Sequence, residues 1–393
     1  MPIKNYCIVV FCLCFMQNVS AQETVKPPFH YLLVDTHNDI LTQSLEKGLA
    51  IDSDLKGKSH SDLSRWKQGG LNVQVFSVWC DGNKQSPFIY ANRQMDTLYV
   101  VAARNPDKIV IIYNAQQLQR AVSKHQIAAM FGVEGGHMIE NKLDNLDSLY
   151  KRGTRYMTLT WNNSTSWATS AKDETEKMDS LPHKGLTDFG KQVVQRMNSL
   201  GMLVDLSHVG EQTFWDAINT TTKPVLVSHS CVYSLCPVSR NLKDDQIKAV
   251  AKNGGVISVN FYSGFLDSNF LKRKEHFVLQ HKAERDSIIA TGKTVPFADD
   301  YLFEKYAAEV KGLRTTLSCL IDHIDYIVKM AGIDHVGLGS DFDGIESPPQ
   351  QLDDVTTYPL IVNTLLQKGY SKKDIRKIMG KNFIRLLKAN EVH

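Results

Sequence analysis

The 393-residue sequence is poor in cysteine, and part of what it has lies at the very start of the chain. It contains 7 cysteines, of which Cys7, Cys12 and Cys14 belong to the first 21 residues. The four that remain are too few and too scattered for the dense pattern of a disulfide-stapled protein. Cys231 and Cys236 are close enough in sequence to bridge, but free thiols fit these positions equally well.

Long hydrophobic runs are missing beyond the N-terminus, which excludes an ordinary transmembrane helix there. The apolar stretch Tyr6–Met16 follows Lys4 and precedes the small residues Val19, Ser20 and Ala21. This arrangement is typical of a secretory signal peptide cleaved after Ala21, and the stretch is too short for a membrane span. The C-terminal segment "RLLKANEVH" carries no hydrophobic anchor tail. We therefore expect a signal peptide over residues 1–21 and an exported, soluble mature protein, secreted or periplasmic.

The chain also lacks a strong excess of either charge. The formal net charge is +3, and 22% of the residues are charged without long basic runs. Because nucleic-acid binding through phosphates needs a concentrated basic surface, we expect no nucleic-acid partner. With 42% hydrophobic residues the composition is that of an ordinary globular protein, and the length fits one large barrel or two average domains.

Short apolar runs rich in β-branched residues recur along the chain, and each ends at a polar or glycine-rich stop. The amphipathic stretches between them predict helices, two of which end at Gly201 and Gly254. Apolar strands that alternate with helices predict a parallel sheet, and eight repeats predict an α/β fold of the (β/α)8 TIM-barrel type. A doubly wound open sheet is the competing fold, although no G-x-G-x-x-G motif follows the first strand. The predicted strands are 31–34, 73–79, 128–133, 156–160, 202–206, 225–228, 255–261 and 335–340.

The interval 262–315 interrupts this rhythm between the seventh and eighth predicted strands. It is highly charged and much longer than an ordinary connection between a strand and a helix. We expect a charged helical insertion that extends the barrel or covers its mouth, and a solvated surface insertion fits the sequence as well as a lid does. Barrel and insertion would together form a single metal-dependent hydrolase domain of residues 22–393.

Histidines and acidic residues follow five of the predicted strands. Because the carboxyl ends of parallel strands meet at one face of a barrel, we expect these side chains to gather at one mouth. Each of them alone has a structural explanation, such as a loop cap or a hydrogen-bonded core histidine, but together they favour a metal site. They are His37 and Asp39 after the first strand, Glu134 after the third, His208 after the fifth, His229 after the sixth, and Asp341 and Asp343 after the eighth.

The number and type of these candidate ligands indicate the kind of metal centre. Three imidazoles, an aspartate and a glutamate exceed the three protein ligands that a single catalytic zinc ion usually keeps. They suit two ions that share Glu134, as in two-metal hydrolytic sites. Nitrogen and oxygen ligands without thiolates fit zinc, with manganese or cobalt as alternatives.

Several segments are spread over nearly the whole mature chain, including "VDTHND", "GVEGG", "LVDLSHV", "VSHS", "SRNLKDD" and "HVGLGSDFDG". In this combination and order they resemble the membrane dipeptidases, also called renal dipeptidases, the zinc peptidase family M19. The resemblance runs from about residue 30 to about residue 390. It implies a TIM-type barrel, two Zn²⁺ per chain and a small peptide substrate, and it leaves a homodimer open.

The resemblance also implies roles for individual residues. Arg240, in the segment "SRN", matches the arginine that binds the terminal carboxylate of the substrate. Asp341 matches the acid that handles the proton or the substrate amine. One ion would be held by His37, Asp39 and Glu134, and the other by Glu134, His208 and His229.

The sequence departs from the family pattern after the fourth predicted strand. Family members of the mammalian type have a histidine there in an "LTH" context, and this chain reads "LTWNN" with Trp161 at that position. An indole can donate one hydrogen bond but cannot take up a proton. We expect Trp161 to bind substrate, with Asn162 or Asn163 as a replacement donor. The long insertion and the missing C-terminal anchor are two further departures.

The resulting hypothesis is a zinc-dependent dipeptidase that acts on short peptides with a free C-terminal carboxylate, with D-residues left open. Two metal ions would lower the pKa of a bridging water from about 15.7 toward 7, and the hydroxide would attack the peptide carbonyl. Asp341 would accept the proton and pass it to the leaving amine, with Glu134 as the shared ligand. Arg240 would fix the terminal carboxylate through a bidentate pair.

Two other functions remain compatible with the same residues. A barrel metallohydrolase could act on a non-peptide amide, ester, lactone or lactam, because the ligand set does not specify the bond that is cleaved. A binding protein without catalysis could keep the barrel and use Trp161 to shape a ligand pocket. Glu134 and Asp341 speak against the second alternative, because binding alone needs no proton carrier.

Overall fold

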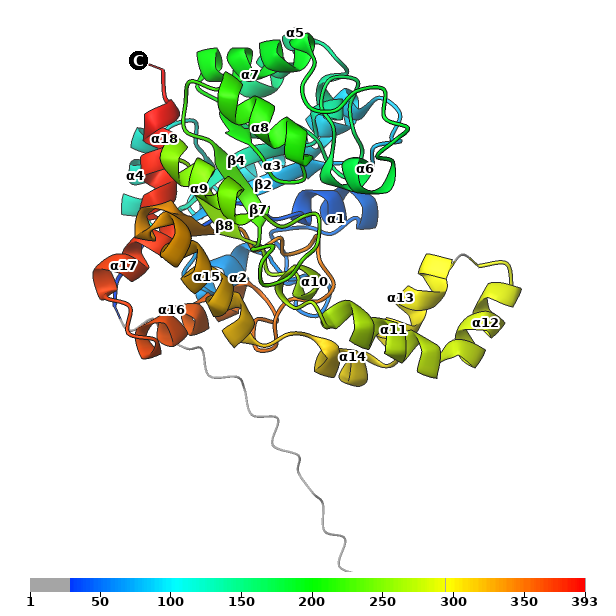
Figure 1. The fold of residues 1–393 in the computed structure, drawn as a ribbon. Coiled ribbons are helices and arrows are strands. Elements are labelled where there is room, and N and C mark those ends of the chain that lie inside the picture. Colours follow the sequence, from blue (N-terminus) through cyan, green and yellow to red (C-terminus); the bar gives the residue numbers. More distant parts are fainter. Residues whose placement is uncertain (1–28, 294, 393) are drawn as a thin grey trace, which may run out of the picture.

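The computed structural model of the chain describes residues 29–293 and 295–392. The predicted signal peptide lies outside these residues. Helices surround a nine-stranded parallel sheet that curls into a nearly closed barrel (Figure 1), which confirms the predicted parallel α/β barrel. The strands are β1 (Val34–Asp35), β2 (Val73–Trp79), β3 (Ile109–Ile111), β4 (Ile127–Glu134), β5 (Thr154–Thr158), β6 (Leu203–Asp205), β7 (Leu226–Ser230), β8 (Val256–Val259) and β9 (Val336–Leu338).

The barrel path runs β1-β2-β4-β5-β6-β7-β8-β9 and closes between its ends. At this junction the Thr36 amide donates to the Leu338 carbonyl at 3.0 Å, and Asn38 forms an isolated parallel bridge with Phe342. Strand β3 was not expected from the sequence. It pairs with the first residues of β4, while β5 pairs with β4 only from Phe131 onward, so β3 lies far from the mouth.

Helices pack around the barrel strands, and two of them confirm the predicted stops. Gly201 ends α7 with φ 78° and Gly254 ends α9 with φ 83°, a left-handed conformation that glycine adopts without steric cost. The helices up to β8 are α1 (Ile40–Lys47), α2 (Leu63–Gln68), α3 (Pro87–Arg104), α4 (Ala115–Ser123), α5 (Leu143–Lys151), α6 (Ala171–Glu176), α7 (Asp188–Leu200), α8 (Glu211–Thr220) and α9 (Asp244–Asn253), with the short 3-10 helix η1 (Gly136–Ile139).

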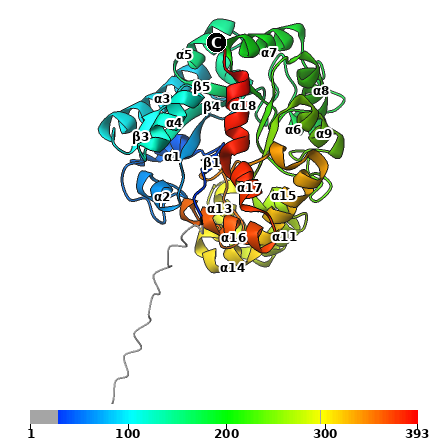
Figure 2. The same ribbon diagram turned by 90° about the vertical axis from the view of Figure 1, so that its left-hand side faces the viewer.

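The helices after β8 build the rest of the ring and the insertion. They are α10 (Ser263–Leu266), α11 (Phe270–Gln280), α12 (Lys282–Ala290), α13 (Val295–Lys305), α14 (Ala307–Leu313), α15 (Leu317–Ala331), α16 (Tyr358–Gln367), α17 (Lys372–Arg376) and α18 (Asn382–Asn390), with the short helical turns η2 (Ile333–His335), η3 (Val355–Thr357) and η4 (Lys377–Lys381). Helix α18 crosses the amino-terminal end of the barrel (Figure 2).

Helix α18 seals this end with apolar side chains. Phe383, Leu386 and Leu387 pack in one cluster with strand residues that include Val73, Val75, Ala128, Met130, Leu203 and Leu226. These strand residues are buried and alternate along their strands, as the inward-facing positions of a barrel do. The closed end is therefore a packed core, and the opposite end is free to carry a site.

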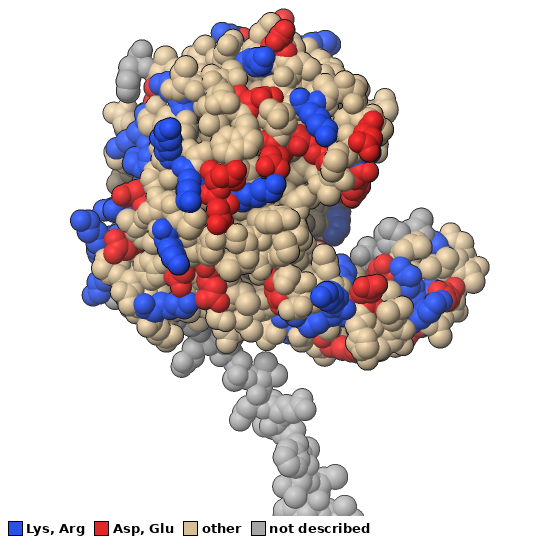
Figure 3. Space-filling model, in the orientation of Figure 1, with Lys and Arg blue, Asp and Glu red and all other residues tan. Residues whose placement is uncertain are grey.

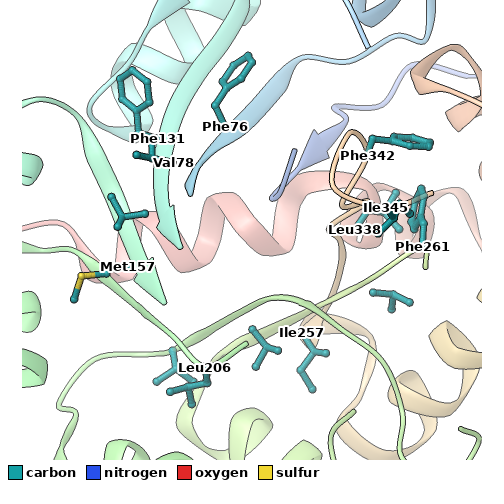
Figure 4. Packing of buried hydrophobic residues seen from close by; sticks show 14 of the residues in the cluster. Phe76, Val78, Phe131, Met157, Leu206, Ile257, Phe261, Leu338, Phe342 and Ile345 are labelled. Atoms are coloured by element: carbon teal, nitrogen blue, oxygen red, sulfur yellow. The ribbon is translucent and has the colours of Figure 1, made fainter. Parts of the chain in front are cut away.

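A larger cluster lies between the strands and the outer helices and continues under the loop that follows β9 (Figure 4). In that loop Phe342 packs against Phe261 and Tyr358, with ring centroids 5.6 and 5.9 Å apart. Phe342 stands between Asp341 and Asp343 in the sequence. Its burial anchors the loop, which fixes the direction in which these two acidic side chains point.

The segment between β8 and α15 forms helices α10 to α14, and helices α11 to α13 project away from the barrel (Figure 1). Figure 3 shows the same segment as a lobe that stands off from the body, with charges of both signs mixed on the visible face. Phe277 and Leu302 are buried inside this lobe. We call residues 270–313 the arm.

The four cysteines of the described part of the chain, Cys80, Cys231, Cys236 and Cys319, are free thiols. Cys231 and Cys236 therefore do not form the bridge that their spacing left open. Burial raises the pKa of the Cys236 thiol to about 11 and that of the Cys80 thiol to about 12. Among the described helices, none has the length and apolar character needed to cross a membrane.

Candidate metal centre

The inward-facing positions of the strands change from apolar to polar toward the mouth of the barrel. On β4, Ala128 and Met130 are followed on the same face by Glu134 at the end of the strand. The strand register places Glu134 opposite Trp79 of β2 and Thr158 of β5. The side chains at the carboxyl ends of these strands therefore lie in one layer across the barrel mouth. The loops that follow β1, β6 and β9 place further side chains next to this layer.

The structure brings together six of the seven side chains expected at the mouth, all except Asp343. His37 Nε2 lies 3.4 Å from a carboxylate oxygen of Asp39, 3.4 Å from Glu134 and 4.0 Å from Asp341. The rings of His37 and His229 lie 3.8 Å apart between centroids. The six side chains, including that of His208, come from the ends of five different strands. All of them are buried except that of Asp341, which is partly buried.

Glu134 presents its two oxygens to two different groups of imidazoles. Its Oε2 atom lies 3.4 Å from His37 Nε2. Its Oε1 atom lies 2.9 Å from His208 Nε2 and 3.4 Å from His229 Nε2. One carboxylate is therefore shared between a His37 side, which includes Asp39, and a His208–His229 side.

The ring of His37 is fixed in one tautomer by Tyr156, which lies across the barrel interior. The Tyr156 hydroxyl donates to the Thr36 carbonyl at 3.1 Å, so it accepts the hydrogen bond from His37 Nδ1 at 2.7 Å. Nδ1 then carries a proton toward Tyr156, and Nε2 faces the centre. Burial lowers the pKa of His37, but Tyr156, Glu134 and Asp39 outweigh it and raise that pKa well above its ordinary value. Gly132 leaves room for this tyrosine, because an added Cβ atom would lie 2.0 Å from Tyr156 Cζ.

His229 is fixed in the same way by a different chain of groups. The Ser228 hydroxyl donates to Asp205 Oδ2 at 2.6 Å and therefore accepts from His229 Nδ1 at 2.8 Å. Asp205 also receives Thr158 Oγ1 at 2.5 Å and the Ser228 amide at 2.8 Å. Burial raises the pKa of Asp205, while these donors favour its ionised form.

His208 completes the set of three imidazoles. Its Nδ1 atom lies 3.1 Å from Asn162 Oδ1, which can only accept, and its Nε2 atom faces the cluster, 3.0 Å from His229 Nε2 and 2.9 Å from Glu134 Oε1. Burial, together with Arg240, lowers the pKa of His208 to about 4. Burial and His37 likewise hold the pKa of His229 well below its ordinary value. Neutral imidazoles with free Nε2 atoms are the form that binds a metal ion.

The donor set fits metal ions, and two orphaned atoms mark where they would bind. His37 Nε2 and Asp39 Oδ1 are buried and have no hydrogen-bond partner among the described residues. Buried polar atoms are costly unless something satisfies them, and a bound cation would do so here. Burial alone would raise the pKa of Glu134, but the neighbouring imidazoles hold that pKa well below its ordinary value. Glu134 is therefore an anion available to a cation.

Asp341 stands at the edge of this cluster in a strained backbone conformation. Its φ is 60°, and His208 has φ 63°, values that non-glycine residues seldom adopt. Asn260 Nδ2 donates to Asp341 Oδ2 at 2.8 Å, which leaves Oδ1 facing His37. Burial, with the nearby charges of Asp39 and Glu134, raises the pKa of Asp341 well above its ordinary value.

Gly344 gives Asp39 and Asp341 the space they occupy. A Cβ atom added at this position would lie 2.2 Å from Asp39 Oδ2 and 2.6 Å from Asp341 Oδ1. Any side chain here would push both carboxylates away from His37. Asp343, by contrast, is used structurally, because it accepts from the His60 amide at 2.6 Å and also from Ser61 and Asn38.

Arg240 lies beside the cluster and is held by its neighbours. Its guanidinium donates to Ser230 Oγ and to the His229 carbonyl, both at 3.1 Å, and lies 5.3 Å above the ring of Phe265. The Nε atom is buried without a hydrogen-bond partner among the described residues. Burial lowers the pKa of Arg240 from its ordinary value. The remaining N–H groups can receive an anion.

Two cavities adjoin the cluster. The first, which we call the mouth cavity, has a volume of about 350 Å³ and is lined by Trp79, Trp161, Asp341 and other residues of the mouth. The second, the Arg240 cavity, has a volume of about 320 Å³. His208 lines both of them. Trp161 thus lines the cavity next to the cluster.

The chain matches the family model of the membrane dipeptidases, peptidase family M19, over residues 28–393. The chain belongs to this family. An uncharacterised dipeptidase of Schizosaccharomyces pombe is 33% identical over 383 residues, which cover 92% of this chain and 81% of that protein. Membership in the membrane dipeptidase family identifies the clustered imidazoles and carboxylates as the candidate centre of a metallopeptidase.

Solved structures of a metallopeptidase and of a probable dipeptidase share this fold. A metallopeptidase of Rhodobacter sphaeroides, solved with a phosphinate mimic of the dipeptide L-Ala-D-Ala, superimposes with a TM-score of 0.74 at 21% identity, over 92% of this chain and 100% of that one. The probable dipeptidase PvdM of Pseudomonas aeruginosa gives a TM-score of 0.74 at 23% identity, over 92% and 96% of the two chains. At these identities the similarity establishes the fold.

Sequence reasoning missed the residues that hold the expected ligands in place. Tyr156, Ser228 and Asn260 lie on or next to strands, where a single polar or aromatic residue in an apolar run carries no obvious signal. The signal that could have found them is alternation, since Tyr156 and Ser228 point to the barrel interior. The pattern "GSDFDG" indicates its acids as candidates, but it gives no sign that its final glycine, Gly344, leaves the space they occupy.

Proposed function

We propose that this protein is a zinc-dependent dipeptidase with two Zn²⁺ per chain. His37, Asp39 and Glu134 would hold one ion, and Glu134, His208 and His229 would hold the other. The observation that carries the proposal is the position of Glu134, whose two oxygens face two separate sets of imidazole nitrogens. Two ions that share a carboxylate would use both of its oxygens in this way.

The relatives support the choice of substrate. The similar Schizosaccharomyces pombe protein bears the name of a dipeptidase, and the Rhodobacter sphaeroides enzyme binds a dipeptide mimic with a C-terminal D-alanine. We extend both features to this chain. It would hydrolyse dipeptides with a free C-terminal carboxylate and accept D-residues at the second position.

The ions, when bound, supply an ionised water near neutral pH and positive charge beside the carbonyl oxygen. Arg240 would bind the terminal carboxylate through the N–H groups that Ser230 and the His229 carbonyl leave free. Asp341 would take up the proton of the attacking water at Oδ1, because Asn260 holds Oδ2, and would deliver it to the leaving amine. Trp161 would form part of the wall against which the substrate packs.

Export by the signal peptide over residues 1–21, with residues 22–393 as one hydrolase domain, remains part of the proposal. Mass spectrometry of the protein from its native host would show an N-terminus at Gln22.

The proposed function is tested with purified protein, an L,D- and an L,L-dipeptide, and matched ester and lactam substrates. Chelation should reduce dipeptide hydrolysis by at least about a hundredfold, and zinc should restore it. Glu134→Gln should lose activity and bound metal together, because the shared ligand loses its charge. Glu275→Gln, an exposed substitution on the arm, serves as the control.

Equal hydrolysis by chelated and metal-loaded protein would contradict the metal requirement. Faster cleavage of the ester or lactam than of every dipeptide would favour the non-peptide alternative. Tight binding of dipeptides by the metal-loaded protein without turnover would favour the inactive binding protein.

A further inference from the structure

Two cavities adjoin the cluster, and each of them would hold one of the two residues of a bound dipeptide. Arg240 lines its own cavity together with residues of α6, α8 and the loop after β7, while Asp341 lines the mouth cavity. His208 lies between the two cavities. If Arg240 receives the terminal carboxylate, which is part of the proposed function, the C-terminal residue lies on the Arg240 side. The N-terminal residue then occupies the mouth cavity.

Two tryptophans form a wall of the mouth cavity next to Glu134. Trp79 ends β2 directly opposite Glu134 in the strand register, and Trp161 follows β5. Their rings meet edge to face, with centroids 4.9 Å apart and planes at 64°. The Trp161 ring also lies 6.5 Å from the ring of His208. Large, rigid rings beside the cluster offer apolar area at little entropic cost.

The mouth cavity has further aromatic lining, and the two glutamates at its rim are hydrogen-bonded. Tyr262 and Phe265 add two rings to the cavity. The rim carboxylate of Glu46 accepts from the Tyr90 hydroxyl at 3.0 Å, and that of Glu346 accepts from Tyr262 at 3.2 Å and from Lys274 at 2.9 Å. Both rim carboxylates are therefore already bonded, the exposed Lys47 also lines the cavity, and the rings lie closest to the cluster.

We propose that the Trp79–Trp161 wall selects dipeptides whose N-terminal residue has an aromatic or large aliphatic side chain. The cavity volume of about 350 Å³ lies in the range of pockets that hold small organic ligands, so such a side chain fits beside the peptide backbone. A hydrophobic pocket discriminates between side chains by tens of fold, which sets the scale of the preference. The inference depends on the proposed function and names its substrate class.

The test compares kcat/KM of the zinc-loaded protein for Phe-Ala, Leu-Ala, Gly-Ala, Lys-Ala and Glu-Ala. The wild-type protein should prefer Phe-Ala and Leu-Ala over Gly-Ala by about tenfold or more. Trp161→Ala and Trp79→Ala should each reduce the Phe-Ala to Gly-Ala ratio at least threefold, and Trp161→Phe, which keeps a ring, should retain most of it. Trp215→Ala on α8, outside both cavities, is the control and should leave the ratio unchanged.

A wild-type ratio near one, a preference for Lys-Ala or Glu-Ala, or an unchanged ratio in both alanine variants would overturn this inference and leave the dipeptidase assignment intact. Absence of hydrolysis for every dipeptide would instead overturn the proposed function, and the inference with it. A second readout is the emission of Trp79 and Trp161, which a phosphinate mimic of Phe-Ala should change more strongly than a mimic of Gly-Ala. Equal changes with the two mimics would also overturn the inference.

Discussion

At the scale of single residues, the site depends on which nitrogen of each imidazole is free. His37, His208 and His229 each engage Nδ1 with a neighbour that accepts, so all three present Nε2 to the same small volume. The three neighbours differ: a tyrosine, an asparagine and a serine backed by an aspartate. Partners of this kind orient metal ligands and raise their basicity, so their loss weakens metal binding without removing a ligand.

Tyr156→Phe tests this dependence. The substitution removes the acceptor of His37 Nδ1 and leaves the Thr36 carbonyl without a buried donor, so we expect metal affinity to fall about 10- to 100-fold. The unfolding free energy should fall by about 1–3 kcal/mol. Competition with a chromophoric chelator measures the affinity, and Tyr370→Phe, whose hydroxyl bonds Asp325 far from the site, is the control. Unchanged affinity in Tyr156→Phe would show that the tautomer of His37 is set by other groups.

The sequence predicted the residues that project from strand ends and not those that hold them. His37, Glu134 and His229 were found because each stands where an apolar run stops. Tyr156 was not, because its neighbours in "RYMTLT" are compatible with any half-buried strand. Its role depends on Gly132 one strand away, and such a pair becomes visible only when the register of β4 and β5 is known.

At the scale of elements, the junction of β1 with β9 and its loop positions half of the site. Asp35 accepts from the Ser340 amide at 2.9 Å, the Ser340 hydroxyl at 2.6 Å and the Tyr358 hydroxyl at 2.5 Å. These bonds tie the loop that carries Asp341 to the strand that carries His37. The sequence predicted the strands on both sides of this junction, but the bonds that close it join residues more than 300 positions apart.

The arm is the element whose role the sequence left most open. Its helical and charged character was predicted, and its direction was not, because direction depends on how α11 and α14 meet the barrel. In the described part of the arm and the segment before it, only Tyr262 and Phe265 line the mouth cavity. The projecting helices therefore lie outside the cavity, as a solvated insertion would.

Phe277→Ala distinguishes a solvated insertion from a lid. Phe277 is 1% exposed and packs against Phe303 and Tyr306, so its truncation should destabilise the arm by about 3–5 kcal/mol. Hydrogen exchange should become faster in α11 to α13 and remain unchanged in the barrel strands. We expect kcat/KM for dipeptides to stay within about twofold, because these helices do not line the cavity. A loss above tenfold with full metal content would identify the arm as a lid.

At the scale of the whole molecule, the residues that stabilise the barrel and the residues of the candidate site lie at opposite ends of it. One end is closed by α18 over an apolar interior, and the other end is lined by carboxylates and imidazoles. The strain at Asp341 and His208, and the buried polar atoms of His37 and Asp39, are concentrated at the second end. The alternation of strands and helices was enough to predict this division, since parallel strands must end at one face.

The central claim is that Glu134 bridges two metal ions, and anomalous diffraction from crystals of the active, zinc-loaded protein tests it most directly. We expect two peaks about 3.5–4 Å apart, each within coordination distance of a different carboxylate oxygen of Glu134. One peak should lie next to His37 and Asp39, and the other next to His208 and His229. A single peak, or two peaks that Glu134 does not join, in crystals of fully active protein would contradict the account.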